Sequence, residues 1–558
     1  MAWGGGGGGG NANSVEAWEK RLLANDPTFT SLHILSFRRI TSSELGRVFA
    51  ALHHNTTLQE LYASGHPLDS ADDDNNTTAK TLALALEHNR TLKRLNVGHD
   101  QLGSNEVLCK ILAEGLRKNM GLERLDLENK GLGGRDEQGT SNSSLRWLAE
   151  ALAGNQGALK EVNLARNKLT DRDMAVVCEA LAVSSGSPHG TLQKLDLSLN
   201  AFEEAGTRSI AELLARQVQG GLTEIDLSDN EITEEGGRAI GRALETNTSL
   251  QRLRMSACMD PPLPVEQGSD EDKIRWDDTV QVLNRALTQD QILEIRTDGD
   301  AVLESIAQSL GSSNQTLQEL WMDDCNISSV GATYLADALR HNRGLMTVRM
   351  RNNQIGNRGA RALGAALCNT GAVDTHNTTL KNLELGSNKV GVLGWHGLVI
   401  ADALESLGLY ENQISVLHEA LEEHHLQQQQ QPPVAASGIA NGHSAIAASE
   451  GVLSKLAHLD VGCNGISRED YTQLGVCLIK GLLPSLIRLE IAGNGDRSQV
   501  PPQQPGDGED DDQDEEGGSG GGDDEQSAWE RLTLRIEEAR PNLAIHWKGA
   551  GAMQQQQS

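Results

Sequence analysis

Aromatic side chains are scarce in this sequence of 558 residues, at only 3% of the total. The core must therefore be filled by Leu, Ile, Val and Ala, as in stacked coils that have little room for rings. Its seven cysteines show no Cys-x-x-Cys spacing, which argues against a zinc knuckle or a redox pair. Cys109, Cys178 and Cys368 fall where helices are expected, and they favour a reducing, intracellular environment.

Long apolar runs are also missing. The glycine-rich amino terminus contains no apolar core of a signal peptide, and no stretch of about 18 apolar residues is present to cross a bilayer. We therefore expect a cytoplasmic protein without a membrane partner.

Positive charge is in deficit, with 48 basic against 78 acidic side chains and a net charge of −30. Nucleic acids and anionic membranes attract positive proteins, so we expect neither as a partner. A protein with a basic surface suits the charge better. Part of the imbalance is local, because eleven acidic residues lie between Asp507 and Glu525.

Catalytic and ligand-binding motifs are absent as well. The sequence has no GxxxxGK[ST] motif and no GxGxxG after a strand, so it predicts no nucleotide cradle. His424 and His425 follow His418 by six and seven residues, whereas a metalloprotease helix needs histidines four apart. The acidic run from Asp72 to Asn75 lacks the spacing of an EF-hand. We predict no catalytic residue, metal, cofactor or small-molecule substrate.

What the sequence does contain is an internal repeat. Units that begin at Leu192 and Leu222 open with Leu-x-x-Leu/Ile-x-Leu-x-x-Asn, pass through a polar turn and close with a helical pattern. A period of about 28 to 30 residues is typical of the long leucine-rich repeat, with one strand and one helix per coil. The fifteen predicted openings are Leu32, Leu58, Leu92, Leu122, Leu159, Leu192, Leu222, Leu250, Ile292, Leu317, Leu345, Leu380, Leu404, Leu456 and Leu486.

The fold class follows from this repeat: an α/β leucine-rich repeat solenoid, or horseshoe, with parallel strands on its concave face and helices on its convex face. Atypical units are expected to cap its two ends. The predicted segments are a disordered Gly-rich tail (1–13), an N-terminal cap (14–31), leucine-rich repeats (32–424), a low-complexity linker (425–450), final repeats (451–495), a disordered acidic loop (496–526), a C-terminal cap (527–549) and a tail (550–558).

Each cap is predicted as a helix followed by a strand. In the first, Val15, Trp18, Leu22 and Leu23 share one helical face, and a strand follows at Leu32, Leu35 and Phe37. The second has Trp529 and Leu532 in a helix and a strand at Leu543, Ile545 and Trp547.

Long insertions interrupt the array at 128–143 and 259–276, and the linker at 425–450 either bulges from a continuous solenoid or acts as a hinge. We favour the bulge, because Leu456, Leu459 and Asn464 resume the repeat in frame.

The ninth motif position normally holds Asn, whose amide donates and accepts hydrogen bonds and can bridge neighbouring coils. We predict a structural ladder of Asn167, Asn200, Asn230, Asn353, Asn388, Asn412, Asn464 and Asn494, with Cys258 and Cys325 as weaker substitutes. His66, Asp100, Lys130 and Asp300 occupy this position in other repeats, where less regular stacking is expected.

Candidate binding residues point outward between the strand leucines. Acidic side chains gather in the fourth to seventh repeats, while arginines surround Trp321. Trp flanked by Arg is typical of an interface hot spot. Alternatively, Trp321 is covered by its own Arg neighbours, which Asp323 and Asp324 neutralise. The predicted partner-binding residues are Arg254, Arg296, Trp321, Arg349, Arg351, Asp196 and Asp226.

On the motifs Leu192–Asn200, Leu222–Asn230 and Leu345–Asn353, the chain resembles the ribonuclease-inhibitor-type subfamily of leucine-rich repeat proteins over roughly residues 28–495. The resemblance implies a non-enzymatic scaffold that binds a protein partner on its concave surface.

Two alternatives stay open. One is a Ran-type GTPase-activating protein or other small-GTPase regulator, because the Ran activators also join such repeats to an acidic carboxy-terminal segment, and Met350–Leu363 is similar to their loops. Glycines interrupt the acidic stretch here, and a cap follows it. The other alternative is a structural spacer without a specific ligand. The acidic loop itself either solvates the chain or contacts a basic protein.

Overall fold

The computed structural model describes residues 13–69, 75–134, 143–155, 157–184, 192–217, 221–258, 297–368, 376–430, 453–494, 531–532 and 534–546. The chain forms two compact units. Unit 1 comprises Met1–Asp260 with Ser313–Gln318, and unit 2 comprises Pro261–Ser312 with Glu319–Ser558. The predicted Gly-rich tail up to residue 12, the acidic loop, Ile292 and Arg296 lie outside the described residues.

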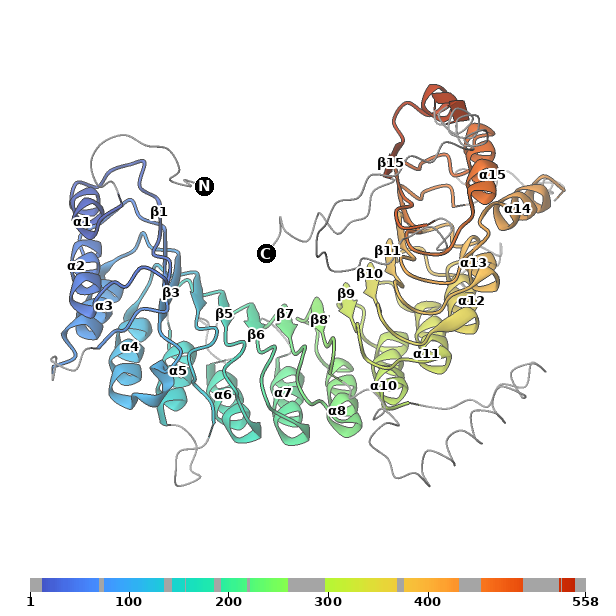
Figure 1. Cartoon of the computed structure of the whole chain (residues 1–558). Coiled ribbons are helices and arrows are strands. Elements are labelled where there is room, and N and C mark those ends of the chain that lie inside the picture. The colour runs from blue at the N-terminus through green and yellow to red at the C-terminus, as the bar shows by residue number, and fades with distance from the viewer. Residues whose placement is uncertain are drawn as a thin grey trace, which may run out of the picture. The chain divides into compact units, whose positions relative to one another are not determined.

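Unit 1 alternates strands with helices (Figure 1). Its strands are β1 (Ser31–His33), β2 (Glu60–Ser64), β3 (Arg94–Gly98), β4 (Arg124–Asp126), β5 (Glu161–Asn163), β6 (Lys194–Asp196), β7 (Glu224–Asp226) and β8 (Arg252–Arg254). Its helices are α1 (Val15–Leu23), α2 (Ser42–Leu52), α3 (Thr77–His88), the short 3-10 helix η1 (Leu102–Ser104), α4 (Glu106–Lys118), α5 (Ser143–Ala153), α6 (Asp171–Ser184), α7 (Glu204–Arg216) and α8 (Glu234–Leu244). Each strand pairs in parallel with the next one along the chain.

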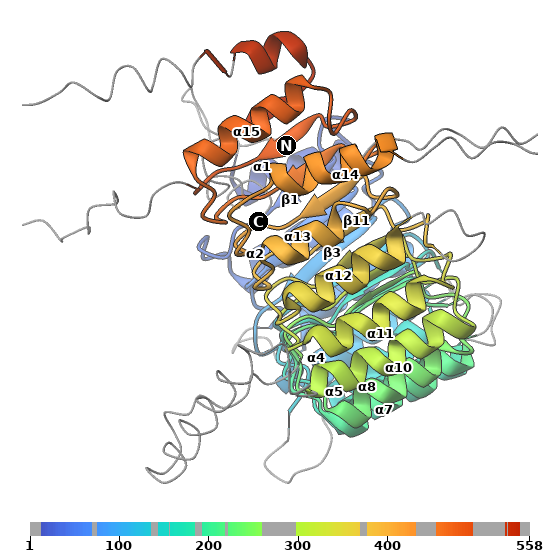
Figure 2. The ribbon, with the colours of Figure 1, turned by 90° about the vertical axis from the view of Figure 1, so that its right-hand side faces the viewer.

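Unit 2 repeats this plan, and its helices α10 to α13 lie side by side in chain order (Figure 2). Its strands are β9 (Glu319–Trp321), β10 (Thr347–Arg349), β11 (Asn382–Glu384), β12 (Ser406–Gly408), β13 (His458–Asp460), β14 (Arg488–Glu490) and β15 (Ala544–His546). Its helices are α10 (Asp298–Ser312), α11 (Ser329–Leu339), α12 (Gly356–Leu367), α13 (Val392–Leu398), α14 (His418–Gln430) and α15 (Arg468–Ile479). These strands are also parallel and paired in chain order.

The repeat leucines fill the space between strands and helices. Leu195 and Ile225 are the middle residues of β6 and β7, and they are buried together with Leu197 and Leu227 two positions later. Their neighbours in the strands point to the opposite face, because side chains alternate along a strand. A helix is about 10 Å wide and strands lie about 4.8 Å apart, so the strand side of each unit is the narrower, concave side. Each unit therefore has the predicted architecture of a leucine-rich repeat solenoid.

Asparagine side chains bridge successive coils after the strands. The Asn230 amide donates to the carbonyls of Leu197 at 3.0 Å and Leu227 at 2.9 Å, and its oxygen accepts from the Asn200 N–H at 3.1 Å. The side chains that donate to the preceding coil in this way are Asn167, Asn200, Asn230, Asn353, Asn388, Asn412, Asn464 and Asn494. These bonds satisfy backbone groups that would otherwise be buried without partners.

A second asparagine row, which we did not predict, lies where the helices turn toward the strands. Asn89 donates to the Leu52 carbonyl at 2.8 Å, and its oxygen accepts from the Leu92 N–H at 2.8 Å. The row consists of Asn55, Asn89, Asn119, Asn155, Asn247, Asn314, Asn342 and Asn377. Most of these residues precede a motif leucine by three positions, and that spacing is the sequence signal for the row.

The repeat predicted to open at Ile292 begins outside the described residues, but the placement of its predicted ladder residue, Asp300, is wrong. Within unit 1, the Gln318 N–H donates to the Gln251 carbonyl at 2.8 Å. Asp300, predicted as a ladder residue, instead lies in α10, where its carboxylate accepts from the N–H groups of Ser328 at 2.8 Å and Gly331 at 2.9 Å. It holds the amino-terminal end of α11, a role that favours a carboxylate.

The first coil also differs from the prediction. Val15, Trp18 and Leu22 are buried as expected, but Leu23 is 58% exposed. The strand ends at His33, and the Arg38 N–H donates to the Leu35 carbonyl in a turn that leads the chain away from the sheet. This turn leaves Leu35 and Phe37 52% and 77% exposed, although their alternation predicts a longer strand.

At the other end of unit 2, β13 pairs directly with β12, so residues 431–452 connect two adjacent coils, as the bulge interpretation requires. Helix α14 extends into the predicted linker as far as Gln430. Strand β15 pairs with β14, and Leu532, Ile536 and Leu543 are buried beside it. The predicted cap residues Trp529 and Trp547 lie outside the described residues.

Candidate functional site

Trp321 and Arg349 lie opposite each other on the strand face of unit 2, because β9 and β10 are paired in register. The Arg349 guanidinium carbon is 5.0 Å from the centre of the Trp321 ring, which is a cation–π contact. Arg349 also pairs through its Nε with Asp323, whose side chain is only 6% exposed, while 33% of the Arg349 side chain stays exposed. The buried Asp323 carboxylate thus holds the Arg349 guanidinium, while part of the Arg349 side chain stays in contact with solvent.

Asp323 also fixes the next arginine. Its Oδ1 accepts the Arg351 backbone N–H at 2.7 Å, and the Arg351 Nη2 bonds to Glu384 Oε2 at 2.7 Å. Burial raises the pKa of the Asp323 carboxyl, and the Arg351 N–H and the Arg349 charge oppose that rise. Removal of Arg349 would therefore leave a buried carboxylate with one fewer counter-charge.

The remaining strands of unit 2 carry acidic side chains and one exposed aromatic ring. Glu384, Asp460 and Glu490 end β11, β13 and β14, and Gly408 ends the strand between the first two. Burial raises the pKa of Asp460, and Glu490 and Glu384 raise it further. Tyr410, two residues beyond Gly408, is 39% exposed. The strand face of unit 2 therefore changes from aromatic and basic at β9 and β10 to acidic from β11 onward.

In unit 1, the carboxylates of Asp196 and Asp226 accept hydrogen bonds from backbone N–H groups of the turns that follow their strands. Asp226 Oδ1 accepts the Ser228 N–H at 3.0 Å, and Asp196 Oδ1 accepts the Ser198 N–H at 3.0 Å. The side chains that accept the N–H two residues later in this way are Asp126, Asn163, Asp196, Asp226 and Asp460. Such turns terminate the strand and occupy one carboxylate oxygen. Sequence reasoning took these acids as surface charge and missed the turn.

Ion pairs cross the strands of unit 1. Lys194 contacts Glu161 at 3.3 Å on one side and Glu224 at 3.4 Å on the other. Arg254 contacts Glu224 at 3.2 Å and Asp226 at 3.6 Å. Although burial raises the pKa of Glu224, the arginines and Lys194 lower it below its usual value overall. Basic and acidic side chains of neighbouring coils thus neutralise each other.

The predicted binding residues separate into two groups. In unit 2, Trp321 ends β9, Arg349 ends the neighbouring β10, and Arg351 lies two residues beyond it. In unit 1, Asp196, Asp226 and Arg254 end the adjacent strands β6, β7 and β8. Both earlier interpretations of Trp321 have a basis in this geometry, because Asp323 pairs with Arg349 and Arg349 stays partly exposed.

Within the described residues, no cluster of three or more His, Cys, Asp and Glu side chains could hold a metal ion. No helix in that part of the chain is both long and apolar enough to cross a bilayer.

Comparison with known proteins agrees with the repeat pattern. The profile of the Leucine Rich repeat family matches residues 222–241, 313–336, 341–364 and 376–394. Ribonuclease inhibitor of Sus scrofa is 26% identical over 297 residues, which cover 52% of this chain and 58% of the inhibitor. The Mus musculus inhibitor is 26% identical over 284 residues, 51% of this chain and 57% of the inhibitor.

The chain therefore spans less than two thirds of the length of these relatives. An internalin structure from Listeria monocytogenes aligns with 86% of this chain and 83% of its own, at 14% identity and a TM-score of 0.35. The family match and the similarity to the two inhibitors support a leucine-rich repeat protein of the ribonuclease-inhibitor-like kind.

Proposed function

We propose that this chain is a non-enzymatic scaffold that binds a protein partner on its strand face, chiefly through Trp321, Arg349 and Arg351 of unit 2. The observation that carries the proposal is the Arg349 guanidinium, stacked 5.0 Å from the Trp321 ring, held by Asp323 and still one-third exposed. The relatives named as ribonuclease inhibitors support the class of function, since their name states inhibition of a protein.

Preorganisation is the physical reason to expect binding here. Ordering a long side chain on association costs about 0.5 to 1.5 kcal/mol, and much of that cost is already met when the side chain is fixed in the free protein. Asp323 fixes Arg349, and Glu384 fixes Arg351. Their remaining N–H groups suit carboxylates of a partner, and the Trp321 ring supplies the apolar contact that interface hot spots require.

Asp196, Asp226 and Arg254 contribute less in this proposal. Their charges are committed to backbone turns and to neighbouring coils, so a partner would have to compete with those contacts. They add electrostatic steering toward a basic partner rather than most of the affinity.

The test is capture of proteins from a eukaryotic lysate by the full chain and by a Trp321→Ala, Arg349→Glu variant that circular dichroism shows to be folded at the assay temperature. A matched control exists on the helices of unit 1, where Lys110 of α4 lies 4.7 Å from the ring of Trp147 on α5. The control variant Trp147→Ala, Lys110→Glu removes the same kind of pair from the helical side.

We expect at least one captured protein to be lost with the strand-face variant and kept with the control. Direct titration of that purified protein should show at least tenfold weaker binding by the strand-face variant. If the variants and the wild type capture the same proteins, the Trp321 cluster is an internal network and the proposal is wrong. If a small GTPase is among the proteins lost, the alternative that the chain regulates a GTPase is tested by measuring GTP hydrolysis with and without the chain.

A further inference from the structure

The first coil of unit 1 presents apolar side chains where other coils do not. Leu35 is 52% exposed and Phe37 is 77% exposed. The position that Leu35 occupies, two residues after the outward residue of the strand, is small or polar in the other coils of unit 1: Ser64, Gly98, Glu128, Ala165, Ser198, Ser228 and Ser256. Leu35 is thus a local departure that packing within this coil does not explain.

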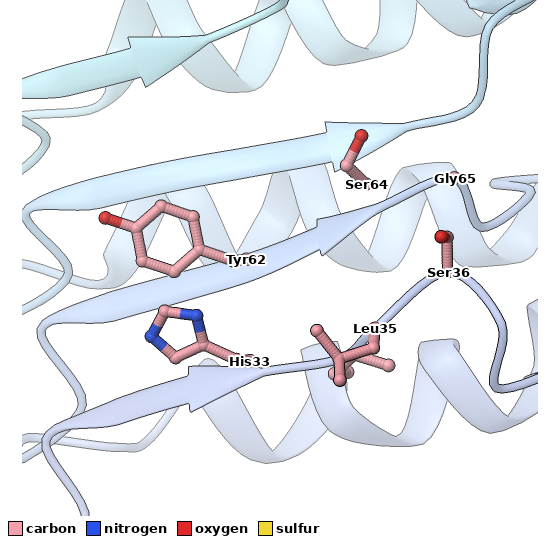
Figure 3. A pocket seen from close by; sticks show the side chains of 7 residues that line it. His33, Leu35, Ser36, Tyr62, Ser64 and Gly65 are labelled. Carbon is pink, nitrogen blue, oxygen red and sulfur yellow. The ribbon is translucent and has the colours of Figure 1, made fainter. Parts of the chain in front are cut away.

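Leu35 borders a pocket of about 350 Å³, and Phe37 lies two residues further along the chain, outside its lining. His33 and Tyr62 come from the paired strands β1 and β2, and their rings stack with centres 4.5 Å apart at one side of it (Figure 3). Leu35 and Ser36 lie along the chain beyond β1, and Gly65 lies beyond β2 (Figure 3). The pocket therefore has an aromatic wall and an aliphatic wall, and its lining residues include no carboxylate.

The Ser64 hydroxyl, which lines the pocket, is hydrogen-bonded to the buried ammonium group of Lys130. The Lys130 Nζ donates to Ser64 Oγ at 2.6 Å, and Lys130 is only 2% exposed. Because the ammonium group uses the hydroxyl oxygen as an acceptor, the Ser64 proton is directed to another acceptor. Such a hydroxyl suits a carbonyl or carboxylate oxygen in the pocket.

Two arginines stand next to Phe37 in the sequence. Arg38 donates to the Asn13 carbonyl at 2.7 Å and lies 5.6 Å from the Trp18 ring. Arg39 is exposed, and within the described residues neither arginine forms an ion pair. Arg38 and Arg39 place two positive charges beside Phe37, whereas the chain as a whole carries −30.

We propose that this pocket is a second docking site, which binds a short extended segment of a partner protein in which an apolar side chain stands beside Asp or Glu residues. The apolar side chain fits between Leu35 and the Tyr62 ring, and the exposed Phe37 ring beside the pocket extends the apolar contact. The carboxylates face Arg39 and the Ser64 hydroxyl. The proposal is independent of the Trp321 cluster, which belongs to unit 2.

The experiment selects a displayed library of random 12-residue peptides on the full chain, after depletion on a Leu35→Ser, Phe37→Ser variant. Enriched peptides are then synthesised with a fluorescein label and titrated by anisotropy. Both substituted side chains are exposed, so the variant should fold, and its melting curve checks this. Leu199→Ser is the matched control, because Leu199 is a 38% exposed leucine elsewhere in unit 1.

We expect a consensus of an apolar residue next to acidic ones. The double variant should bind at least tenfold more weakly, Arg39→Glu should weaken binding and reduce its dependence on salt, and Leu199→Ser should change nothing. The Trp321→Ala, Arg349→Glu variant should bind these peptides normally, which separates this site from the proposed function.

Three outcomes would overturn the proposal: no peptide that depends on Leu35 and Phe37, a consensus rich in Lys and Arg, or binding that appears only after Trp3→Ala. The last result would identify the chain's own amino terminus as the occupant. If a peptide of residues 506–526 binds the pocket and no library peptide does, the occupant is the acidic segment of this chain itself, and the assignment to a partner protein is likewise wrong.

Discussion

The strand faces of units 1 and 2 are built from the same repeat, yet they use their charges differently. In unit 1, Lys194 lies between Glu161 and Glu224, and Arg254 reaches both Glu224 and Asp226. In unit 2, Arg349 is stacked against Trp321 and is held by a single buried carboxylate.

The contrast has a simple physical cause. When opposite charges alternate from coil to coil, each side chain finds partners on the neighbouring strands, and the face neutralises itself. At β9 and β10 the outward residues are Trp321 and Arg349, and one third of the Arg349 side chain stays exposed. Repeats that share a core can therefore differ in binding capacity through one outward position per coil.

The largest effects should be equal in the two units, because the core column is common to both. Leu227→Ala in unit 1 and Leu385→Ala in unit 2 each empty a site that is fully buried. We expect each to lower the free energy of unfolding by about 2 to 5 kcal/mol through lost burial and cavity formation. Urea denaturation measures the loss. An unchanged curve for either variant would contradict the assignment of that residue to the column.

The asparagine ladder should come next. Asn388 donates to the Met350 carbonyl at 2.7 Å and the Gly386 carbonyl at 3.0 Å, and Asn230 makes the equivalent bonds in unit 1. Asn388→Ala and Asn230→Ala leave buried backbone groups unsatisfied, at a cost of about 1 to 3 kcal/mol each. Hydrogen exchange of the adjoining strands provides the measurement, and full protection in either variant would argue against the bridge.

Substitutions on the strand faces should then lower the stability of the two units by different amounts. Arg349→Met leaves Asp323 buried with less compensation, which we expect to cost about 1 to 3 kcal/mol. Lys194→Met removes two ion pairs of a partly exposed ammonium group, each worth about 0.2 to 1 kcal/mol at most. Thermal and urea unfolding of both variants under identical conditions compares them. Equal losses would mean that the two faces do not differ as described.

The smallest expected effect is that of Lys130 on how the free energy of unfolding changes with pH. Burial lowers the pKa of its ammonium group, so between the folded and unfolded pKa values the unfolded chain binds more protons. Stability from this group therefore rises as the pH rises through the folded pKa, toward the unfolded value. Lys130→Met should flatten the alkaline part of the stability profile, measured by urea unfolding from pH 7 to 10. A profile parallel to that of the wild type would show that Lys130 has no such effect.

The spacing of Leu and Asn within the motif was enough to predict the coils, because Leu227 and Asn230 belong to a pattern that recurs about every 28 to 30 residues. The same motif placed Asn388 correctly. Spacing cannot reveal which side chains of different coils meet, since Lys194 and Glu224 are brought together only by strand register. The turn formed by Asp226 depends on a contact two residues away, and its sequence signature is shared with ordinary surface acids.

The errors have equally local causes. Phe37 continues an alternating pattern, but the chain turns away from the sheet after His33 and leaves it exposed. Asp300 is the ninth residue counted from Ile292, so the motif predicts a ladder residue. It lies in α10 instead, where its carboxylate accepts the Gly331 N–H at the start of α11. In both places a turn or a cap overrides a periodicity that is otherwise reliable.

The most direct test of the contrast between the faces is a binding titration with one purified partner obtained by capture. The wild type is compared with Trp321→Ala, Arg349→Glu in unit 2 and with Asp196→Asn, Asp226→Asn in unit 1, and circular dichroism confirms that each variant is folded at the assay temperature. We predict at least a tenfold loss of affinity for the first variant and less than a threefold loss for the second. A greater loss from the unit 1 variant would contradict the account.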